Sequence, residues 1–354
     1  MKIVIISPFQ NSLPRGIERF CYSIANAMAS LGHNVKIYSW KAKKEFSWGK
    51  LHKNVKIKEC PNLRYFQRSW IGYYYNFLLK KDKPDAVLLN FLYHGEINLS
   101  KNFNYYYILH SPASQIVDRY KFIQKNICKF RELSFIAVSN MVKKEAEPFI
   151  EGRKCDVIFN GVDTELFMPK KSDNIVNRNG NLKIVTVAAL EERKGMQYFI
   201  KALSKFPNKE KVEYHIYGDG PYKNILLDLI KEFQLEEFVL LHQPINNLHD
   251  ILPNFDLFVL LSKGEAFPIA PLEAMASGLP LLVSNLEPYP EFIEESFGFM
   301  LNREDENELI KAIDLLLNKP KMLSQMKDHG RSTALHFSWN NVANNYITFI
   351  DELK

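Results

Sequence analysis

The feature that most limits the fold is an alternation of short strand-like runs with helical stretches, which occurs twice. In the first half the strand-like runs are Lys2–Ser7, Asn34–Ser39, Val55–Cys60, Ala86–Phe91, Tyr105–Leu109, Phe135–Val138 and Asp156–Phe159. In the second half they are Lys183–Ala189, Glu213–Tyr217, Phe238–His242, Leu257–Leu261, Leu281–Ser284 and Gly298–Leu301. Runs of this kind between helices are typical of parallel strands with both faces covered. The sequence therefore predicts two doubly wound α/β domains in tandem.

The domain boundary is expected close to the polar stretch Lys170–Asn181, which separates the two alternations. A chain of 354 residues exceeds the usual size of one hydrophobic core. We expect an N-terminal domain over residues 1–166 and a C-terminal domain over 167–337. The turn dipeptide Asn160-Gly161 lies near that boundary.

Several helices are predicted from the spacing of their apolar residues. The first is the best defined, because its apolar residues recur at helical spacing up to Leu31 and Gly32 stands where a helix ends. Further helical stretches are Met196–Phe206, Tyr222–Phe233, Glu306–Leu317 and a last one within 338–354.

The charge is divided unequally between the halves. Residues 1–168 carry 26 lysines and arginines against 14 acidic residues, a net charge of +12. Residues 169–354 carry 20 against 26, a net charge of −6. The N-terminal half is therefore expected to meet an anionic ligand or surface. Nucleic acid is disfavoured, because the sequence contains no zinc-finger, basic-zipper or RNP-like motif.

An anionic membrane surface fits the basic N-terminal half better. Within Arg64–Lys81, the residues Tyr65, Phe66, Trp70, Tyr73, Tyr74 and Phe77 interleave with Arg64, Arg68, Lys80 and Lys81. The alternative is that these aromatic residues pack inside the domain.

No apolar run is long enough for a transmembrane helix. The four scattered cysteines are interpreted as reduced thiols, so we expect a cytoplasmic protein, peripheral at the inner face of the membrane.

The segment from Gly264 to Asn285, GEAFPIAPLEAMASGLPLLVSN, concentrates the candidate chemistry. Pro271 suits the first position of a helix and Gly278 the residue after its end. Glu265 would then lie in the loop before the helix and Glu273 in its first turn. Open α/β sheets bind ligands at the carboxyl ends of their strands, and a helix N-terminus favours an anion such as phosphate. The alternative is that Glu273 only complements the helix dipole and Glu265 is solvated.

This segment resembles the donor-site sequence of retaining glycosyltransferases of family 4, which have the GT-B fold. The resemblance rests on the spacing of Glu265 and Glu273, on the run Leu272–Ala276, and on Gly278 with Pro280. It implies two Rossmann-like domains facing a central cleft, with the C-terminal helix crossing back to the N-terminal domain. The N-terminal domain would bind the acceptor and the C-terminal domain the nucleotide sugar.

The resemblance also implies roles for individual residues. Glu265 would hold hydroxyls of the donor sugar, and Glu273 would accept hydrogen bonds from the ribose. His110, at the end of a buried strand, would lie beside the transferred sugar; a lone histidine there is otherwise a structural residue. Lys194 and Arg193 would neutralise the donor diphosphate.

Other implied donor contacts are made by backbone groups or near glycines. These residues are Gly16, Gly218, Ala266, Phe267 and Ile269. Nearby, Glu18 and Arg19 match the family pattern but read equally well as surface residues.

The sequence departs from the family pattern at three places. Arg15 replaces the first of two glycines, Ala188-Ala189 stands where Gly-Arg is frequent, and Pro268 stands where many relatives have glycine. Pro268 has no N–H to donate to the sugar, and Arg193 is the candidate substitute for the missing arginine.

The resemblance implies a retaining, hexosyltransferase-type enzyme. It would move a sugar from a UDP- or GDP-sugar to a hydroxyl of a glycan or lipid-linked glycan in cell-surface polysaccharide or glycoconjugate biosynthesis, without a metal or another cofactor. Two alternatives stay open: a non-catalytic GT-B partner subunit of an active transferase, and a GT-B sugar-nucleotide epimerase. The epimerase would need acid/base residues beside the sugar, and His110 is the candidate that the sequence offers.

Overall fold

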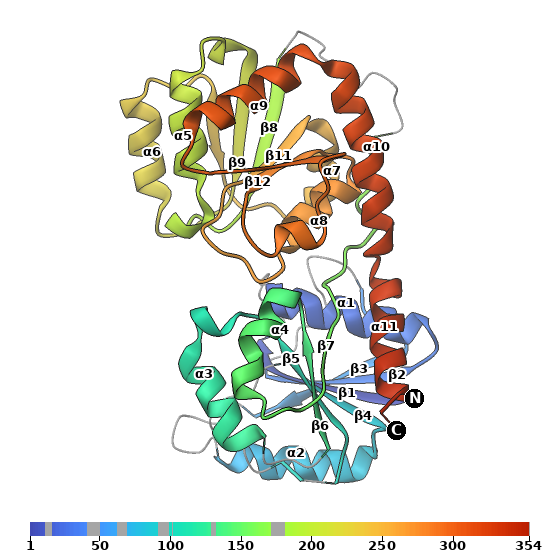
Figure 1. Cartoon of the computed structure of the whole chain (residues 1–354). Coiled ribbons are helices and arrows are strands. Elements are labelled where there is room, and N and C mark those ends of the chain that lie inside the picture. The colour runs from blue at the N-terminus through green and yellow to red at the C-terminus, as the bar shows by residue number, and fades with distance from the viewer. Residues whose placement is uncertain are drawn as a thin grey trace. The chain divides into compact units, whose positions relative to one another are not determined.

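The computed structural model describes residues 1–10, 16–40, 50–61, 69–90, 99–100, 102–128, 132–170 and 181–353. The chain forms two compact units, one of Met1–Gly161 with Trp339–Lys354 and one of Val162–Ser338 (Figure 1). The boundary between the two units therefore falls directly after Gly161 of the turn dipeptide Asn160-Gly161. The sequence analysis placed this boundary a few residues later, after residue 166.

In the N-terminal unit, the described strands form a seven-stranded parallel sheet of order β3-β2-β1-β4-β5-β6-β7. The strands are β1 (Lys2–Gln10), β2 (Asn34–Trp40), β3 (Val55–Cys60), β4 (Ala86–Leu89), β5 (Tyr105–Leu109), β6 (Leu133–Ala137) and β7 (Cys155–Val157). Every residue of β4 and β5 is buried, which explains their uninterrupted apolar sequence. The strand order reverses between β1 and β4.

Helices cover both faces of this sheet. They are α1 (Gly16–Ser30), α2 (Ser69–Asp82), α3 (Val117–Phe122), the π-helical turn η3 (Ile123–Ile127), α4 (Asn140–Ala146) and α11 (Trp339–Asp351). Figure 1 shows α11 beside α1, although more than 300 residues separate them. The Phe20 ring lies 5.8 Å from that of Trp339, and Ser30 Oγ donates to Asn340 Oδ1 at 3.1 Å. The predicted return of the last helix to the N-terminal unit is confirmed.

In the C-terminal unit, the described strands form a six-stranded parallel sheet of order β10-β9-β8-β11-β12-β13. The strands are β8 (Leu182–Val187), β9 (Val212–Tyr217), β10 (Val239–His242), β11 (Leu257–Leu260), β12 (Leu281–Ser284) and β13 (Gly298–Leu301). The helices are α5 (Met196–Lys205), α6 (Lys223–Glu232), α7 (Leu248–Ile251), α8 (Ile269–Ala276), α9 (Glu306–Asn318) and α10 (Pro320–His336). The order reverses between β8 and β11.

The helices differ from the sequence interpretation in two places. Helix α8 begins at Ile269, so Pro271 is its third residue and Glu273 lies beyond its first turn. Helix α10 was not predicted; Pro320 begins it, and in the first turn of a helix the missing N–H of proline leaves no intrahelical hydrogen bond unmade. Of the two interpretations left open for Glu18, the surface one does not hold, because Glu18 is buried within α1.

Candidate active site

The best-defined candidate site lies at the carboxyl edge of the C-terminal sheet. Ligands of open α/β sheets bind where the strand order reverses, and here that point is between β8 and β11. The 3₁₀ turn Glu192–Lys194 follows β8, and the loop Leu261–Glu265 follows β11. Lys194 and Glu265, distant in sequence, are thus carried by the connections after two adjacent strands.

These two side chains form a buried ion pair. Lys194 Nζ donates to Glu265 Oε1 at 2.6 Å, and the side chains are 14% and 8% exposed. A lysine ammonium has three donors, so two remain for another anion after Glu265 has taken one. The pair therefore combines a held carboxylate with a positive charge that has hydrogen-bonding capacity left.

Buried hydroxyl groups support the Glu265 loop. Ser262 Oγ and Tyr289 Oη are 3.1 Å apart, and Ser284 Oγ donates to the Ser262 carbonyl at 2.8 Å. Burial, with the nearby Glu265 carboxylate as the next cause, raises the pKa of Tyr289 well above its usual range. Tyr289 therefore stays a neutral phenol. The loop that carries Glu265 is held by the hydrogen bonds that Ser262 makes with Tyr289 and Ser284.

Glycines allow the connections after β8, β9 and β11 to approach one another. Gly195 has φ +76°, and a Cβ atom added there would lie 1.7 Å from the Leu261 carbonyl oxygen. A Cβ atom on Gly218 would lie 2.0 Å from the Ala188 carbonyl oxygen. Packing against the chain itself therefore explains both glycines, and a donor contact at Gly218 remains a proposal.

The helix after Glu265 contributes the second carboxylate. Glu273 is 3% exposed and lies on α8, and Ala266 is half-buried in the loop before it. Phe267 is also buried; its ring lies 4.7 Å from that of Phe292. Its side chain is thus part of the core, and only its backbone remains to contact a ligand. Ile269, half-buried, is the first residue of the helix.

Arg193 differs from its neighbour Lys194. Its Nε donates to Glu191 Oε2 at 2.7 Å, and the two side chains are 50% and 40% exposed. Lys263 Nζ binds Glu192 Oε1 at 2.6 Å and so joins the loops after β11 and β8. The structure therefore brings Lys194 to Glu265 and places Arg193 in a surface ion pair.

A second cluster lies at the carboxyl edge of the N-terminal sheet. The Nε2 atom of His110 lies 2.5 Å from Oδ1 of Asn90, and its ring meets Phe20 edge-on at 4.8 Å. Asn90 is fully buried and donates to Cys21 Sγ at 2.7 Å. Burial is the main cause that lowers the pKa of His110 to about 3, so the ring is neutral near pH 7. An Nε2–H donated to Asn90 leaves Nδ1 as the acceptor.

Sequence reasoning missed Asn90. The predicted strand Ala86–Phe91 included it, whereas β4 ends at Leu89; Phe91 itself lies outside the described residues. A polar residue directly after an apolar strand was the available signal. Gly16, the first residue of α1, is exposed, and no atom of the described residues lies within 4 Å of a Cβ atom added there. Arg15 lies outside the described residues.

Two family models together match almost the whole chain. The model described as Glycosyltransferase Family 4 matches residues 14–166, and the one described as Glycosyl transferases group 1 matches residues 168–333. The chain belongs to the family 4, group 1 glycosyltransferases. The C-terminal model covers Lys194, Glu265 and Glu273, and the N-terminal model covers His110. Lys194, Glu265 and Glu273 therefore lie within the group 1 domain of a glycosyltransferase.

Bacterial glycosyltransferases are among the relatives of this chain. An uncharacterized glycosyltransferase of Haemophilus influenzae is 26% identical over 341 residues, which span 89% of this chain and 90% of the relative. A UDP-Gal:alpha-D-GlcNAc-diphosphoundecaprenol alpha-1,3-galactosyltransferase of Escherichia coli is 30% identical over 59% of this chain and 55% of its own length.

Solved structures confirm that this glycosyltransferase has the GT-B fold. Sucrose-phosphate synthase of Thermosynechococcus elongatus matches with a TM-score of 0.80 and 16% identity, over 100% of this chain and 99% of that one. Anabaena Alr3699/HepE in complex with UDP matches with a TM-score of 0.81 and 17% identity, over 99% and 100% of the two chains.

Within the described ranges, no group of three or more His, Cys, Asp or Glu side chains is arranged to hold a metal ion. None of the helices in the described part of the chain has both the length and the apolar character needed to cross a membrane.

Proposed function

We propose that this glycosyltransferase transfers a sugar, with retention of configuration, from a nucleotide diphosphate sugar to a hydroxyl of a glycan or lipid-linked glycan. The observation that carries the proposal is the buried Lys194–Glu265 pair at the β8/β11 switch point. The Escherichia coli relative is named as a transferase that uses UDP-galactose and a diphosphoundecaprenol acceptor, and Anabaena HepE has been solved in complex with UDP-glucose. Both support a UDP-sugar donor.

In the proposed reaction, the bond from the anomeric carbon to the diphosphate breaks and a bond to the acceptor oxygen forms. The acceptor proton passes to the leaving phosphate oxygen on the same face, and a nucleoside diphosphate departs. Lys194 stabilises charge that grows on the diphosphate in the transition state, which is how an electrostatic contact accelerates a reaction. Arg193 could join only after leaving its surface pair with Glu191.

The remaining residues are assigned by position. Glu265 holds hydroxyls of the donor sugar, and Glu273 accepts from the ribose. The N–H groups that begin α8, with the backbone of Ala266 and Phe267, face the donor. We assign neutral His110 to the transferred sugar, because Asn90 holds one ring nitrogen and leaves the other as an acceptor.

The test is product analysis with UDP- and GDP-sugars and a panel of glycan and lipid-linked acceptors. We expect release of nucleoside diphosphate and a product whose anomeric configuration, read by NMR, matches the donor. Glu265→Gln should lower the rate at least about 100-fold, the scale seen when a transition-state contact is lost. An inverted product would refute retention. Tight nucleotide binding without turnover on any acceptor would favour the non-catalytic partner.

We also propose that α2 docks on an anionic membrane. Its side chains divide into two faces: Ile71, Tyr75 and Leu78 are buried, whereas Trp70, Tyr73 and Phe77 are 67%, 59% and 64% exposed. The alternative that the aromatic residues of this segment pack inside the domain therefore holds only for the buried face of α2. Lys80 and Lys81 lie in the last turn of the helix, and an exposed apolar face beside basic residues is typical of interfacial helices. Arg64, Tyr65, Phe66 and Arg68 lie outside the described residues.

Vesicle co-sedimentation tests the docking proposal. The chain should bind vesicles that contain phosphatidylglycerol and not those of phosphatidylcholine alone. Trp70→Ala/Phe77→Ala should abolish binding, whereas Ile225→Ala/Leu227→Ala, a matched exposed pair on α6, should not. Equal binding to both vesicles would rule the proposal out, as would equal loss in both variants.

A further inference from the structure

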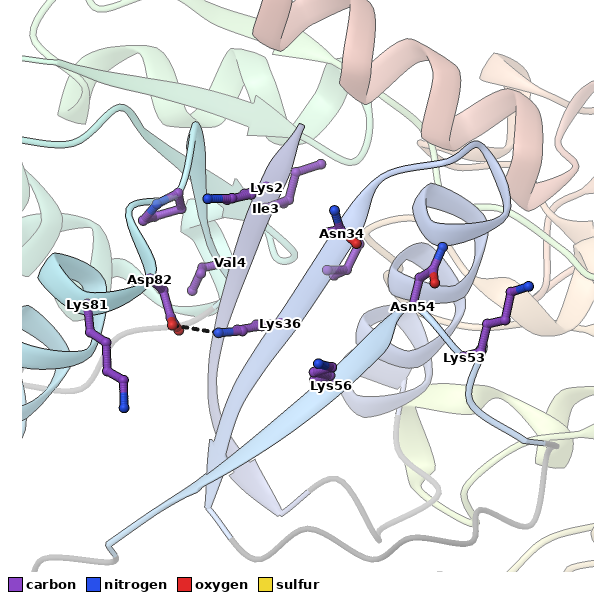
Figure 2. A pocket seen from close by; sticks show the side chains of 12 residues that line it. Lys2, Ile3, Val4, Asn34, Lys36, Lys53, Asn54, Lys56, Lys81 and Asp82 are labelled. Atoms are coloured by element: carbon purple, nitrogen blue, oxygen red, sulfur yellow. Dashed lines mark hydrogen bonds and ion pairs between the residues drawn. The ribbon is translucent and has the colours of Figure 1, made fainter.

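A hollow of about 520 Å³ lies at the amino ends of β1, β2 and β3, where α2 also ends (Figure 2). His110 and Asn90 follow the carboxyl ends of strands in the same sheet, so the hollow is a separate place. Its basic lining residues are Lys2, Lys36, Lys53, Lys56 and Lys81, called the lysine pocket below.

The strand register brings three of these lysines to one face of the sheet. Lys36 pairs directly with Lys56 on β3, and it pairs with Val4 on β1. Side chains alternate along a strand, so Lys2 shares the face of Val4 and therefore that of Lys36. Figure 2 shows the three lysines on neighbouring strands. Tyr38, on the same face, stacks on Tyr75 of α2 with ring centroids 6.1 Å apart.

Among the described residues of the lining there is a single carboxylate, and it already accepts two hydrogen bonds. Asp82 accepts from Lys36 Nζ at 2.5 Å, drawn dashed in Figure 2, and from Tyr38 Oη at 2.6 Å. Burial opposes its ionisation, but these hydrogen bonds lower the pKa of Asp82, so it is an anion near pH 7. Just outside the lining, Asp85 accepts from the Lys2 backbone N–H.

The other four lysines, Lys2, Lys53, Lys56 and Lys81, are exposed, and among the described residues none of them forms an ion pair. The charge of Lys81 helps to lower the pKa of Asp82, but the described lining still holds more lysines than carboxylates and keeps an excess of positive charge. Like charges on adjacent strands repel and destabilise a sheet, and a hollow lined by one sign of charge attracts a counter-ion. A bound anion would remove this repulsion.

We propose that the lysine pocket binds a phosphate group, independently of the sugar-transfer site. Lysine ammonium groups bind phosphate as point charges, and the volume is within the range of ligand pockets, about 300–1,000 Å³. The phosphate can belong to a soluble phosphate ester or to a phospholipid headgroup. Lys81 follows Phe77 and Trp70 on one stripe of α2, at four- and seven-residue steps, so a headgroup can reach the pocket from a membrane on α2.

Lysine acetylation followed by mass spectrometry tests the site residue by residue. The probes are glycerol 3-phosphate, against sodium chloride of equal ionic strength, and phosphatidylglycerol vesicles, against phosphatidylcholine vesicles. At twice the Kd only one site in three is empty, so acetylation of Lys53, Lys56 and Lys81 should slow about threefold. The exposed lysines Lys121, Lys125 and Lys144 of the same unit should not slow.

A matched pair of variants keeps the test specific. Lys56→Ala/Lys81→Ala should abolish the slowing at Lys53, and Lys121→Ala/Lys125→Ala should preserve it; both remove two exposed charges. Slowing by glycerol 3-phosphate identifies a soluble ester, and slowing by anionic vesicles alone identifies a headgroup. No slowing with either probe, or equal slowing at the control lysines, would overturn the proposal.

Discussion

Replacing Lys194 by methionine is the sharpest probe of the candidate site. The substitution leaves the Glu265 carboxylate, 8% exposed, without the ammonium that lies 2.6 Å away. Breaking a buried ion pair from one side costs about 3–5 kcal/mol, because a charge stays buried without its partner. Lys194 is itself 14% exposed, so some water reaches the site and we expect the lower end, about 3 kcal/mol.

A double-mutant cycle separates the ion pair from the loss of side-chain packing. Glu265→Gln removes the buried charge, so the double variant Lys194→Met/Glu265→Gln should be more stable than the sum of the single effects predicts. We expect a coupling energy of about 1.5–3 kcal/mol, the upper part of the range for contacting residues.

The assay is urea unfolding of the full chain followed by circular dichroism. Arg193→Met is the control, because the Arg193–Glu191 pair is 50% and 40% exposed and such pairs contribute about 0–1 kcal/mol. If Lys194→Met were no more destabilising than Arg193→Met, the pair would not be the buried element described above.

Three further predictions follow from buried contacts. The imidazole of His110 titrates near pH 6.5 when unfolded and at about 3 when folded. The unfolded chain therefore binds more protons between these values, and about 2 kcal/mol of stability present above pH 6.5 is lost by pH 5. His110→Gln should remove that part of the pH dependence in urea titrations. Gly195→Ala should cost about 3 kcal/mol or more, because its Cβ would strike the Leu261 carbonyl oxygen, whereas Gly16→Ala should be neutral or stabilising. Arg331→Met should lower the melting temperature, since its guanidinium donates to three backbone carbonyls, with an expected loss of about 2–4 kcal/mol.

Much of the fold could be predicted from the sequence, because parallel strands buried on both faces are uninterrupted apolar runs. The fully buried strands Tyr105–Leu109 and Leu281–Ser284 have the predicted bounds. Helix starts were less accessible: α8 begins two residues before Pro271, and Pro320 begins α10 although proline often marks a helix end. In both cases proline fits more than one position in the first turn.

The sequence identified the residues of the candidate site but not the contacts between them. Lys194 and Glu265 were identified from sequence, yet their pairing depends on the order of β8 and β11 in the sheet. Nothing local in the sequence distinguishes Arg193, which turns to Glu191, from Lys194. Asn90 acquires its importance only because β4 and β5 are neighbours, which brings it against His110.

The same dependence on topology applies to the lysine pocket. Lys2, Lys36 and Lys56 are scattered in the sequence, and each alone reads as a solvated surface residue. Their common face follows from the β3-β2-β1 order and its register. The excess positive charge of the N-terminal half was evident from its composition. Only the structure shows where on the fold the lysines gather.

The central claim is that the ammonium group of Lys194 in the C-terminal unit binds the diphosphate of a nucleotide sugar. Calorimetric titration of UDP and GDP into the wild type, Lys194→Met and Lys201→Met tests it directly; Lys201 is an exposed lysine of α5. Loss of a charged hydrogen bond is worth about 1.5–3 kcal/mol, so Lys194→Met should bind the preferred nucleotide at least about tenfold more weakly. Lys201→Met should bind it as the wild type does. Equal affinities for all three proteins would contradict the account.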